Sequence, residues 1–166
     1  MIALAGSFYR IVFEHLAAQV LHGAIHPEGR FHYDGQPALY ASPSPETAAV
    51  AIARYLRPGD PERALVPLRL SGARIQDLRD PATCATLGID PATPSVPWSR
   101  ERARGLPATS WRASDAVRAS GADGMVYSSR TEPARWHLVL FRWNTAGAAR
   151  IATQGTTRRW TPPAAF

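Results

Sequence analysis

Arg30 is the first residue whose type and setting could do chemistry. It lies in the loop sequence GRFHYDG (29–35), and its planar guanidinium could make paired hydrogen bonds to a phosphate or a carboxylate. A surface ion pair with Glu28 or Asp34 explains the same arginine equally well. The local sequence therefore indicates an anion contact and leaves open whether the anion is a ligand or a neighbouring side chain.

Tyr40 and Ser129 are two further candidates. Tyr40 could stack on a planar ring, although packing within a half-buried strand is the simpler interpretation. Ser129 follows the strand-like run MVYS (125–128), at a point where side chains can face a cleft on a rigid scaffold. A serine that hydrogen-bonds its own backbone in a turn would look the same in sequence.

Several common catalytic devices are absent from the sequence. It has no Lys, so it has no Gly-rich phosphate loop with Lys, and it has no HExxH, GxSxG or CxxC motif. His26 and His32 are too isolated to predict a metal site. A single cysteine, Cys84, cannot form an internal disulfide, which fits a reducing cytoplasm.

Charge and hydropathy narrow the class of protein further. The chain has a net charge of +6, and all 19 basic residues are Arg, which invites a nucleic-acid interpretation. The arginines are scattered, however, and we expect Arg102, Arg104, Arg158 and Arg159 on the solvated surface. The longest apolar run, residues 48–53, is too short to span a bilayer, so we expect a cytoplasmic protein that is neither membrane-spanning nor secreted.

The elements that must position these residues can be read from periodicity and turn signals. Strands are predicted at 7–13, 38–41, 65–70, 73–78, 125–128, 137–143 and 149–153, and helices at 14–21, 45–56 and 111–120. Residues 81–97 contain four prolines and are predicted to be irregular. Strands and helices mix without a regular βαβ rhythm, and 166 residues suit one domain. We therefore predict a single α+β domain, 1–166, with small mixed or antiparallel sheets, flanking helices and a frayed end over about 155–166.

The second predicted helix has a defined start. Ser44 can cap it, Pro45 suits its first position, and Glu46 complements its positive end. Glu46 is thus a carboxylate near the candidate site as well as a helix-start residue.

Three stretches resemble one known family. The succession GRFHYDGQPALYASPSPETA (29–48) resembles the RES-domain signature, in which a Gly-Arg-aromatic-Asn/His turn leads to an LY strand and a helix opening with PETA. The segment GADGMVYSSR (121–130), followed by HLVLF (137–141), resembles the second motif of that family, and FYRIV (8–12) matches its usual opening. The resemblance covers residues 8–143.

The resemblance implies a fold, an activity and partners. RES-domain proteins are toxins of bacterial toxin–antitoxin modules, their partner is an Xre-type DNA-binding antitoxin, and their fold is similar to that of ADP-ribosyltransferase toxins. They consume NAD⁺ by cleaving its nicotinamide–ribose bond, with water, phosphate or a protein as acceptor of the ADP-ribose. By resemblance, this chain is a cytoplasmic, metal-independent enzyme that meets DNA only through its antitoxin.

The resemblance also assigns site residues. It places the catalytic Arg, Tyr and Ser of the family at Arg30, Tyr40 and Ser129. We further expect Arg10 and Arg30 on the pyrophosphate of NAD⁺, with His32, Tyr40 and Ser129 also in contact with the dinucleotide.

The family's glutamate is the one departure. Its usual position falls on Ala51, and Glu46, more than one turn earlier, is the only carboxylate in this helix. Because a carboxylate would strengthen its contact as positive charge develops on the ribose, its loss should slow cleavage. Glu46 is then the catalytic candidate. If Glu46 cannot reach the site, the chain is a slow enzyme, an enzyme that uses another acid such as Asp34, or a protein that binds NAD⁺ without turnover.

Two other classes of function stay open. Small size and basic charge suit a toxin that cleaves or binds nucleic acid. The missing glutamate suits a catalytically impaired RES-like module that only binds its partner.

Overall fold

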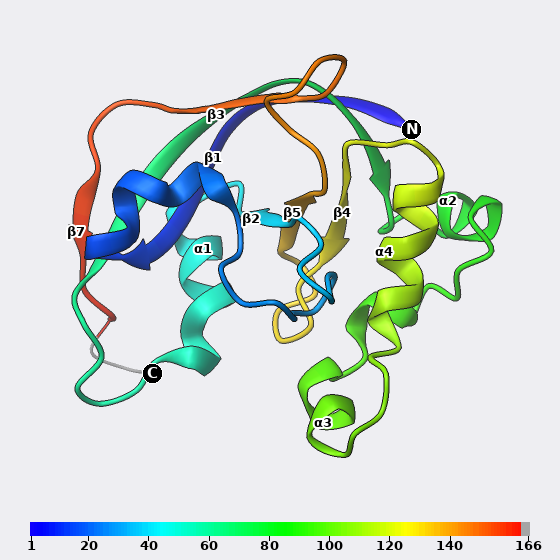
Figure 1. Cartoon of the computed structure of the whole chain (residues 1–166), viewed down its shortest axis with the longest axis horizontal. Coiled ribbons are helices and arrows are strands. Elements are labelled where there is room, and N and C mark those ends of the chain that lie inside the picture. The colour runs from blue at the N-terminus through cyan, green and yellow to red at the C-terminus, as the bar shows by residue number, and fades with distance from the viewer. Residues whose placement is uncertain (164–166) are drawn as a thin grey trace.

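Two long antiparallel strands, β1 (Ile2–Phe13) and β3 (Arg63–Asp77), arch across one side of the molecule (Figure 1). The computed structural model describes residues 1–163. Within that range seven strands form one mixed sheet in the order β1-β3-β4-β5-β2, with two short strands added to β3. The other strands are β2 (Leu39–Ala41), β4 (Gly124–Ser128), β5 (Trp136–Leu140), β6 (Arg150–Thr153) and β7 (Arg158–Trp160). The β3–β4 pairing is parallel and the others are antiparallel, which confirms the predicted α+β class.

Helices flank the short strands of the sheet. In Figure 1, α1 and α4 lie on either side of β2, β4 and β5, and α3 is at the tip of an extension from the body of the molecule. The α-helices are α1 (Pro45–Ile52), α2 (Pro81–Thr86), α3 (Trp98–Ala103) and α4 (Ser110–Ala119), and the 3-10 helices are η1 (Glu14–His22), η2 (Ala53–Tyr55) and η3 (Thr93–Ser95). No helix of residues 1–163 is long and apolar enough to cross a membrane.

The two faces of the sheet carry separate cores, because successive side chains of a strand point to opposite faces. The first face is covered by η1 through Val20 and contains Phe8, Val66, Leu68, Leu70, Val126, Leu138 and Leu140. The second face is covered by α4 through Ala113 and Val117 and contains Phe31, Met125, Tyr127, Val139 and Phe141. At the far end of the second face, α1 packs Ala48 and Ala49 on Ile11 of β1. Tyr40 and Tyr127 therefore belong to the second face.

The start of α1 follows the predicted capping. The Ser44 hydroxyl accepts a hydrogen bond from the Thr47 N–H at 3.2 Å, and Pro45 occupies the first helical position. The helix ends earlier than predicted, at Ile52, and continues as the 3-10 turn η2.

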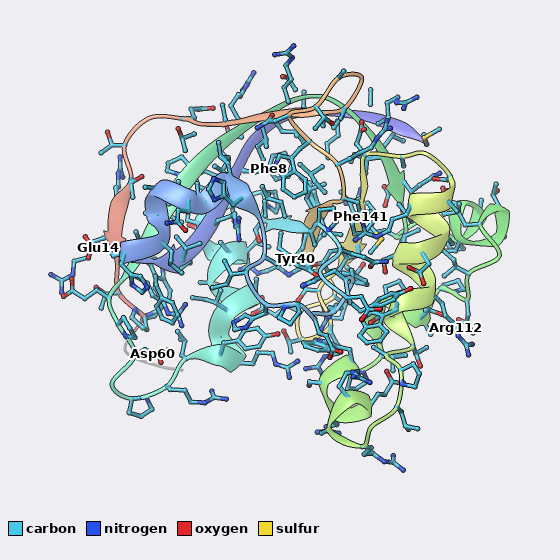
Figure 2. The ribbon with its side chains drawn as sticks, in the orientation of Figure 1. Phe8, Glu14, Tyr40, Asp60, Arg112 and Phe141 are labelled. Atoms are coloured by element: carbon cyan, nitrogen blue, oxygen red, sulfur yellow. The ribbon has the colours of Figure 1, made fainter. Side chains whose placement is uncertain are left out.

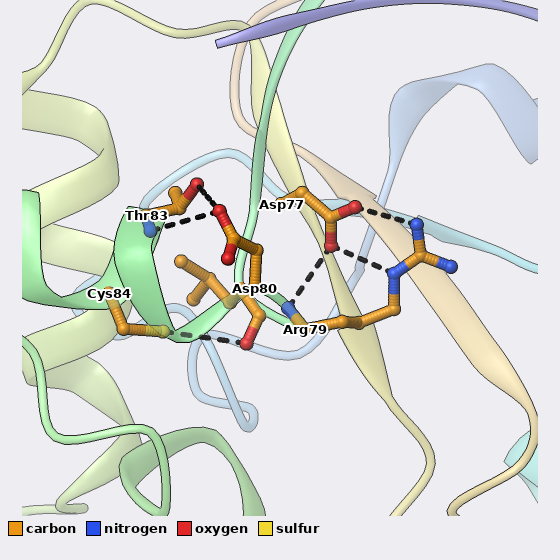
Figure 3. Close-up of polar contacts among 6 residues, drawn as sticks. Asp77, Arg79, Asp80, Thr83 and Cys84 are labelled. Atoms are coloured by element: carbon orange, nitrogen blue, oxygen red, sulfur yellow. Dashed lines mark hydrogen bonds and ion pairs between the residues drawn. The ribbon is translucent and has the colours of Figure 1, made fainter.

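The prediction of an irregular 81–97 segment was wrong for α2 (Figure 3). Asp80 caps this helix by accepting from the N–H groups of Ala82 and Thr83, both at 3.1 Å, with Pro81 in the first turn. The Cys84 thiol then donates to the Leu78 carbonyl at 3.4 Å and is fully buried. An Asp-Pro pair at a helix start is a readable signal, and it was outweighed by the other three prolines.

Two further differences concern β3 and the C-terminal segment. The two strands predicted around Ser71 and Gly72 are one strand, β3, with a change of register against β1 at this point. Within the segment expected to fray, β7 pairs with residues 63–65 of β3. Residues 164–166 of that segment lie outside the described residues.

Candidate functional site

The loop that carries Arg30 is held by α4. Five hydrogen bonds join them. The Ser110 hydroxyl donates to the Arg30 carbonyl (2.5 Å), the Trp111 indole to the Gly29 carbonyl (2.9 Å) and the Tyr33 hydroxyl to Asp115 Oδ2 (3.0 Å). Arg118 Nη2 donates to the carbonyls of Pro37 (3.0 Å) and Phe31 (3.4 Å). The Tyr33 ring also stacks on Trp111, with ring centroids 4.5 Å apart. Because two of these bonds fix backbone carbonyls next to Arg30, the backbone of this arginine is placed by the fold.

His32 and Tyr40 complete the anchoring of this loop from the other side. His32 Nε2 lies 3.0 Å from the His26 carbonyl, which can only accept, so Nε2 carries the proton. Burial lowers the pKa of His32, so at neutral pH its Nδ1 accepts from the Tyr40 hydroxyl at 2.9 Å. The same hydroxyl accepts from the Phe31 N–H at 3.0 Å. The contacts of His32 and Tyr40 therefore hold the loop against β2.

Gly29 is required by this arrangement. A Cβ atom at this position would lie 2.2 Å from the His32 ring, a distance that no side chain tolerates. The Gly29–His32 backbone bridge brings the ring this close. The glycine of the motif is thus explained by close approach of an imidazole.

The guanidinium of Arg30 itself is unpaired among the described residues. Glu28, one predicted partner, instead accepts two hydrogen bonds from Arg102, both at 3.0 Å. Asp34, the other, is exposed in the turn, with a φ of 49°. The nearest aromatic ring is Phe31, whose centroid lies 5.9 Å from Arg30 Cζ. Neither alternative ion pair forms, and the cation remains free for an anion from outside the chain.

Three buried polar rings lie within reach of the Arg30 charge. Burial raises the pKa of Tyr40 and of Tyr127, and the positive charge of Arg30 acts on both in the opposite direction. Burial lowers the pKa of His137 to about 4, helped by the charges of Arg30 and Arg135. At neutral pH this part of the second face therefore presents neutral phenols, a neutral imidazole and a cation. Tyr40 lies near the middle of the molecule, between α1 and α4 (Figure 2).

His137 and Ser42 were not predicted as site residues. His137 is opposite Tyr127 in the β4–β5 pair, and its Nδ1 lies 2.9 Å from the Ser42 hydroxyl. Both residues are buried. A histidine at the head of the apolar run HLVLF is a signal for a satisfied polar contact in the core, but its partner is 95 residues away in sequence.

Ser129 fits both interpretations made from the sequence, a side chain at the end of a strand and a serine that closes a turn. The alternation of β4 puts it on the face of Tyr127, and its N–H extends the strand ladder to the Arg135 carbonyl at 2.8 Å. Its hydroxyl accepts from the Glu132 N–H at 3.3 Å and so closes a turn. The hydroxyl proton of Ser129 is directed to no closer protein acceptor than Thr131 Oγ1, at 3.5 Å.

Arg10 is not brought together with these residues. It pairs with Val66 of β3, a residue of the first core, whereas its neighbour Tyr9 pairs with Ser42 on the second face. Its guanidinium is buried under η1 and donates to the Val20 carbonyl. Burial lowers its pKa to about 10. The structure thus separates Arg10 from Arg30 by the thickness of the sheet.

Two residues of α1 bear on the family's glutamate: Ala51 stands at its usual position, and Glu46 is the only carboxylate of the helix. Glu46 is exposed in the first turn, and a hydrogen bond to its own backbone N–H lowers its pKa. Ala51 lies one helical turn after Thr47, so the two share one side of α1. Thr47 is buried and accepts a hydrogen bond from Arg135 of the turn before β5, whereas Ala51 is exposed. Within residues 1–163, no carboxylate contributes to the pKa shifts of Tyr40, Tyr127 or His137.

Other surface features lie away from this cluster. A hollow of about 550 Å³ over β3, β6 and residues 144–148 is lined by none of the predicted site residues. Of the arginines expected on the surface, Arg102 and Arg159 form ion pairs with Glu28 and Glu62, and Arg104 and Arg158 are exposed. Within the described part of the chain, no group of three or more His, Cys, Asp or Glu side chains is placed to hold a metal ion.

The fold and the motif-bearing loop define a class of protein. A model of the RES domain matches residues 7–163, so the chain belongs to the RES-domain family, as its motifs predicted. The fold is similar to that of a chain in the crystal structure of the MbcT–MbcA toxin–antitoxin complex of M. tuberculosis, with a TM-score of 0.58 and 15% sequence identity. That similarity covers 97% of this chain and 87% of the other. No curated protein matches the sequence.

Proposed function

We propose that this chain is the toxin of a toxin–antitoxin module and that it cleaves the nicotinamide–ribose bond of NAD⁺ at the cluster formed by Arg30, Tyr40, Tyr127, Ser129 and His137. The observation that carries the proposal is the unpaired Arg30 guanidinium, presented by a loop that α4 fixes through backbone carbonyls. A positioned, unpaired arginine is suited to a phosphate group, and a dinucleotide supplies two.

The reaction needs few chemical groups from the protein. The bond between nicotinamide and C1 of the ribose breaks, nicotinamide leaves with the bonding electron pair, and positive charge builds on the ribose. The oxygen of water, phosphate or a protein side chain then bonds to that carbon and gives up its proton to solvent. Positioning of the dinucleotide accounts for much of the acceleration in such a scheme.

The residues have separate roles in this scheme. Arg30 binds the pyrophosphate, and Ser129, whose hydroxyl can exchange its long contact with Thr131 for a ligand, hydrogen-bonds the ribose next to nicotinamide. Tyr40 and His32 are positioning residues, because their contacts hold the loop that presents Arg30. Arg10 and Glu46 are left out, since the first is buried on the opposite face and the second is exposed at the start of α1.

The proposed toxin acts in the cytoplasm and is neutralised by a protein antitoxin of the Xre type, through which alone the complex meets DNA. Membership of the RES-domain family and the fold shared with a chain of a toxin–antitoxin complex support this assignment.

Release of nicotinamide from NAD⁺ by the purified chain tests the proposal. We expect release by the wild-type protein, with and without added phosphate, and loss of release in Arg30→Ala. Arg112→Ala is the matched control, because Arg112 is exposed on α4 and lies away from the site (Figure 2). Equal release by Arg30→Ala and the wild-type protein would overturn the proposal.

Binding of NAD⁺ without cleavage is the second candidate function, and Ala51 is the observation that favours it. An exposed methyl group of α1 stands at the position where the family resemblance expects a carboxylate, which would stabilise charge on the ribose. Ala51→Glu separates the two candidates. A variant that releases nicotinamide when the wild-type protein only binds NAD⁺ would establish the binding function.

A further inference from the structure

The buried pair Ser42–His137 has one polar atom that the protein does not use. His137 is 6% exposed and Ser42 is 2% exposed, and their hydrogen bond occupies Nδ1 of the imidazole. Nε2 has no hydrogen-bond partner among residues 1–163. It is not among the fully buried polar atoms that lack a partner, so it keeps some exposure to solvent. One nitrogen is therefore fixed and the other is left for a ligand.

Ser42 decides which nitrogen carries the proton. Its backbone N–H and carbonyl are both bonded to Tyr9, at 3.0 and 2.8 Å, so the residue is fixed between β1 and β2. Its hydroxyl has a single hydrogen and His137 Nδ1 as its partner. Because a buried hydroxyl that fails to donate loses free energy, the hydroxyl donates and Nδ1 accepts. A neutral His137 then carries its proton on Nε2 and is a hydrogen-bond donor.

The charges facing His137 favour an anionic partner for this donor. Arg30 faces it from the 29–35 loop and Arg135 from the turn before β5. Arg135 is already engaged by Glu132 and by the Thr47 hydroxyl, whereas Arg30 is unpaired among the described residues. Tyr127, across from His137 on β4, is neutral. The unpartnered donor and the unpaired cation thus belong to the same group of side chains, in which the carboxylate of Glu132 is already engaged by Arg135.

We propose that His137 contacts the ligand directly, its Nε2–H donating to a phosphate oxygen beside Arg30, and that Ser42 is a positioning residue that fixes the tautomer. This inference rests on the proposed function. It adds the residue pair Ser42–His137, of which His137 contacts the phosphate. The oxygen belongs either to the pyrophosphate of NAD⁺ or to a free phosphate that acts as acceptor.

Two substitutions at His137 form a matched pair for testing the contact. In His137→Gln the side-chain amide can place an N–H near the position of Nε2, whereas the shorter amide of His137→Asn lies near that of Nδ1. A purely structural role predicts the reverse ranking, because Asn keeps the contact with Ser42. At the second position, Ser42→Ala removes the hydroxyl and Ser42→Thr retains it.

Calorimetric binding of ADP-ribose to the folded variants measures the effect. We expect affinity to fall about tenfold in His137→Asn and severalfold in Ser42→Ala, with recovery in His137→Gln and Ser42→Thr. In nicotinamide release the change should lie in KM rather than kcat. If ADP-ribose binding is unchanged but the stimulation of release by inorganic phosphate is lost, the contact is to the free phosphate.

The outcomes separate this inference from the proposed function. A wild-type protein that neither binds ADP-ribose nor releases nicotinamide contradicts the proposed function, and the inference with it. If the wild-type protein binds and His137→Asn, shown to be folded by its thermal unfolding, matches it in both assays, the inference alone is overturned.

Discussion

Arg10 and Arg30 both precede apolar residues in recognisable motifs, yet the two faces of the sheet put them to different uses. On the first face Arg10 is buried beneath η1, its guanidinium donates to the Val20 carbonyl, and burial lowers its pKa to about 10. On the second face the backbone of Arg30 is held by α4 while its guanidinium is unpaired among residues 1–163. One arginine helps to close a core and the other remains available to a ligand.

An arginine suited to bind a ligand has a backbone that the fold holds in place and a guanidinium without a partner in the protein. Arg10 is satisfied by a carbonyl of the same chain, so it has little left to offer a ligand. Arg30 is fixed at its carbonyl, and its expected partner Glu28 is occupied by Arg102. Substitutions on the two faces should therefore separate activity from stability.

The largest expected effect is on activity, from Arg30→Ala. Removal of the unpaired cation of the candidate site should lower kcat/KM for nicotinamide release about 100-fold, since loss of a single positioned donor costs about that much. The free energy of unfolding should change by less than about 0.5 kcal/mol, because the side chain makes no hydrogen bond within the described residues. Steady-state kinetics and urea unfolding check both. An unfolding change as large as that of a core substitution would contradict the comparison.

The next effect is on the pH dependence of stability, through His137. Its pKa in the folded protein is about 4, below its ordinary value near 6.5, because of burial and the charges of Arg30 and Arg135. Between these values the unfolded chain takes up a proton that the folded chain does not. Stability is therefore highest above pH 6.5 and is lost as the pH falls towards 4, by up to roughly 3 kcal/mol.

Urea unfolding at a series of pH values measures this loss. His137→Gln should flatten the dependence between pH 6.5 and 4, while the contribution of His32, whose pKa is also lowered by burial, stays. An unaltered pH dependence in His137→Gln would remove His137 as its cause.

On the first face, Arg10→Ala should behave as a core substitution. It leaves the Val20 carbonyl without its donor and opens space beneath η1, which should cost about 2 kcal/mol of unfolding free energy. Nicotinamide release per folded molecule should stay within about twofold of the wild-type value, because Arg10 lies across the sheet from the site. A large fall in kcat/KM of fully folded Arg10→Ala would place this arginine in the site after all.

A smaller effect is expected from Tyr40→Phe. It removes the hydroxyl that bonds the Phe31 N–H and His32 Nδ1, which should cost about 1 kcal/mol of stability. If Tyr40 acts by positioning Arg30, affinity for ADP-ribose should fall while binding of adenosine, which lacks phosphate, is unchanged. An equal fall for both ligands would instead make Tyr40 a contact to the nucleoside.

The sequence predicted the elements that depend on local signals. The cap at Ser44 and Pro45, the short β2 strand and the apolar strands β4 and β5 are set by neighbours within a few residues, and all form where they were expected. The sequence could not show to which face of the sheet Arg10 points, because this depends on which residues of β3 pair with β1. The alternation of side chains along β1 can be read from the sequence, but the elements that cover each face of the sheet cannot.

Sequence motifs mark only part of the candidate site. Arg30, Tyr40 and Ser129 stand in motifs, and the structure puts all three on the second face. Ser42 and His137 come together through a contact between distant parts of the chain, so no local pattern could pair them. The hydrogen bonds from α4 to the Arg30 loop also join distant parts of the sequence. Ser110 and Trp111 are 80 and 82 residues from their partners in the loop.

The first measurement is the cellular NAD⁺ level within minutes of inducing this chain without any antitoxin, with Arg30→Ala and Arg112→Ala induced in parallel. We expect a rapid fall of NAD⁺ with the wild-type chain and with Arg112→Ala, and none with Arg30→Ala. Growth arrest at a constant NAD⁺ level, or an equal fall with Arg30→Ala, would rule out NAD⁺ cleavage that depends on Arg30.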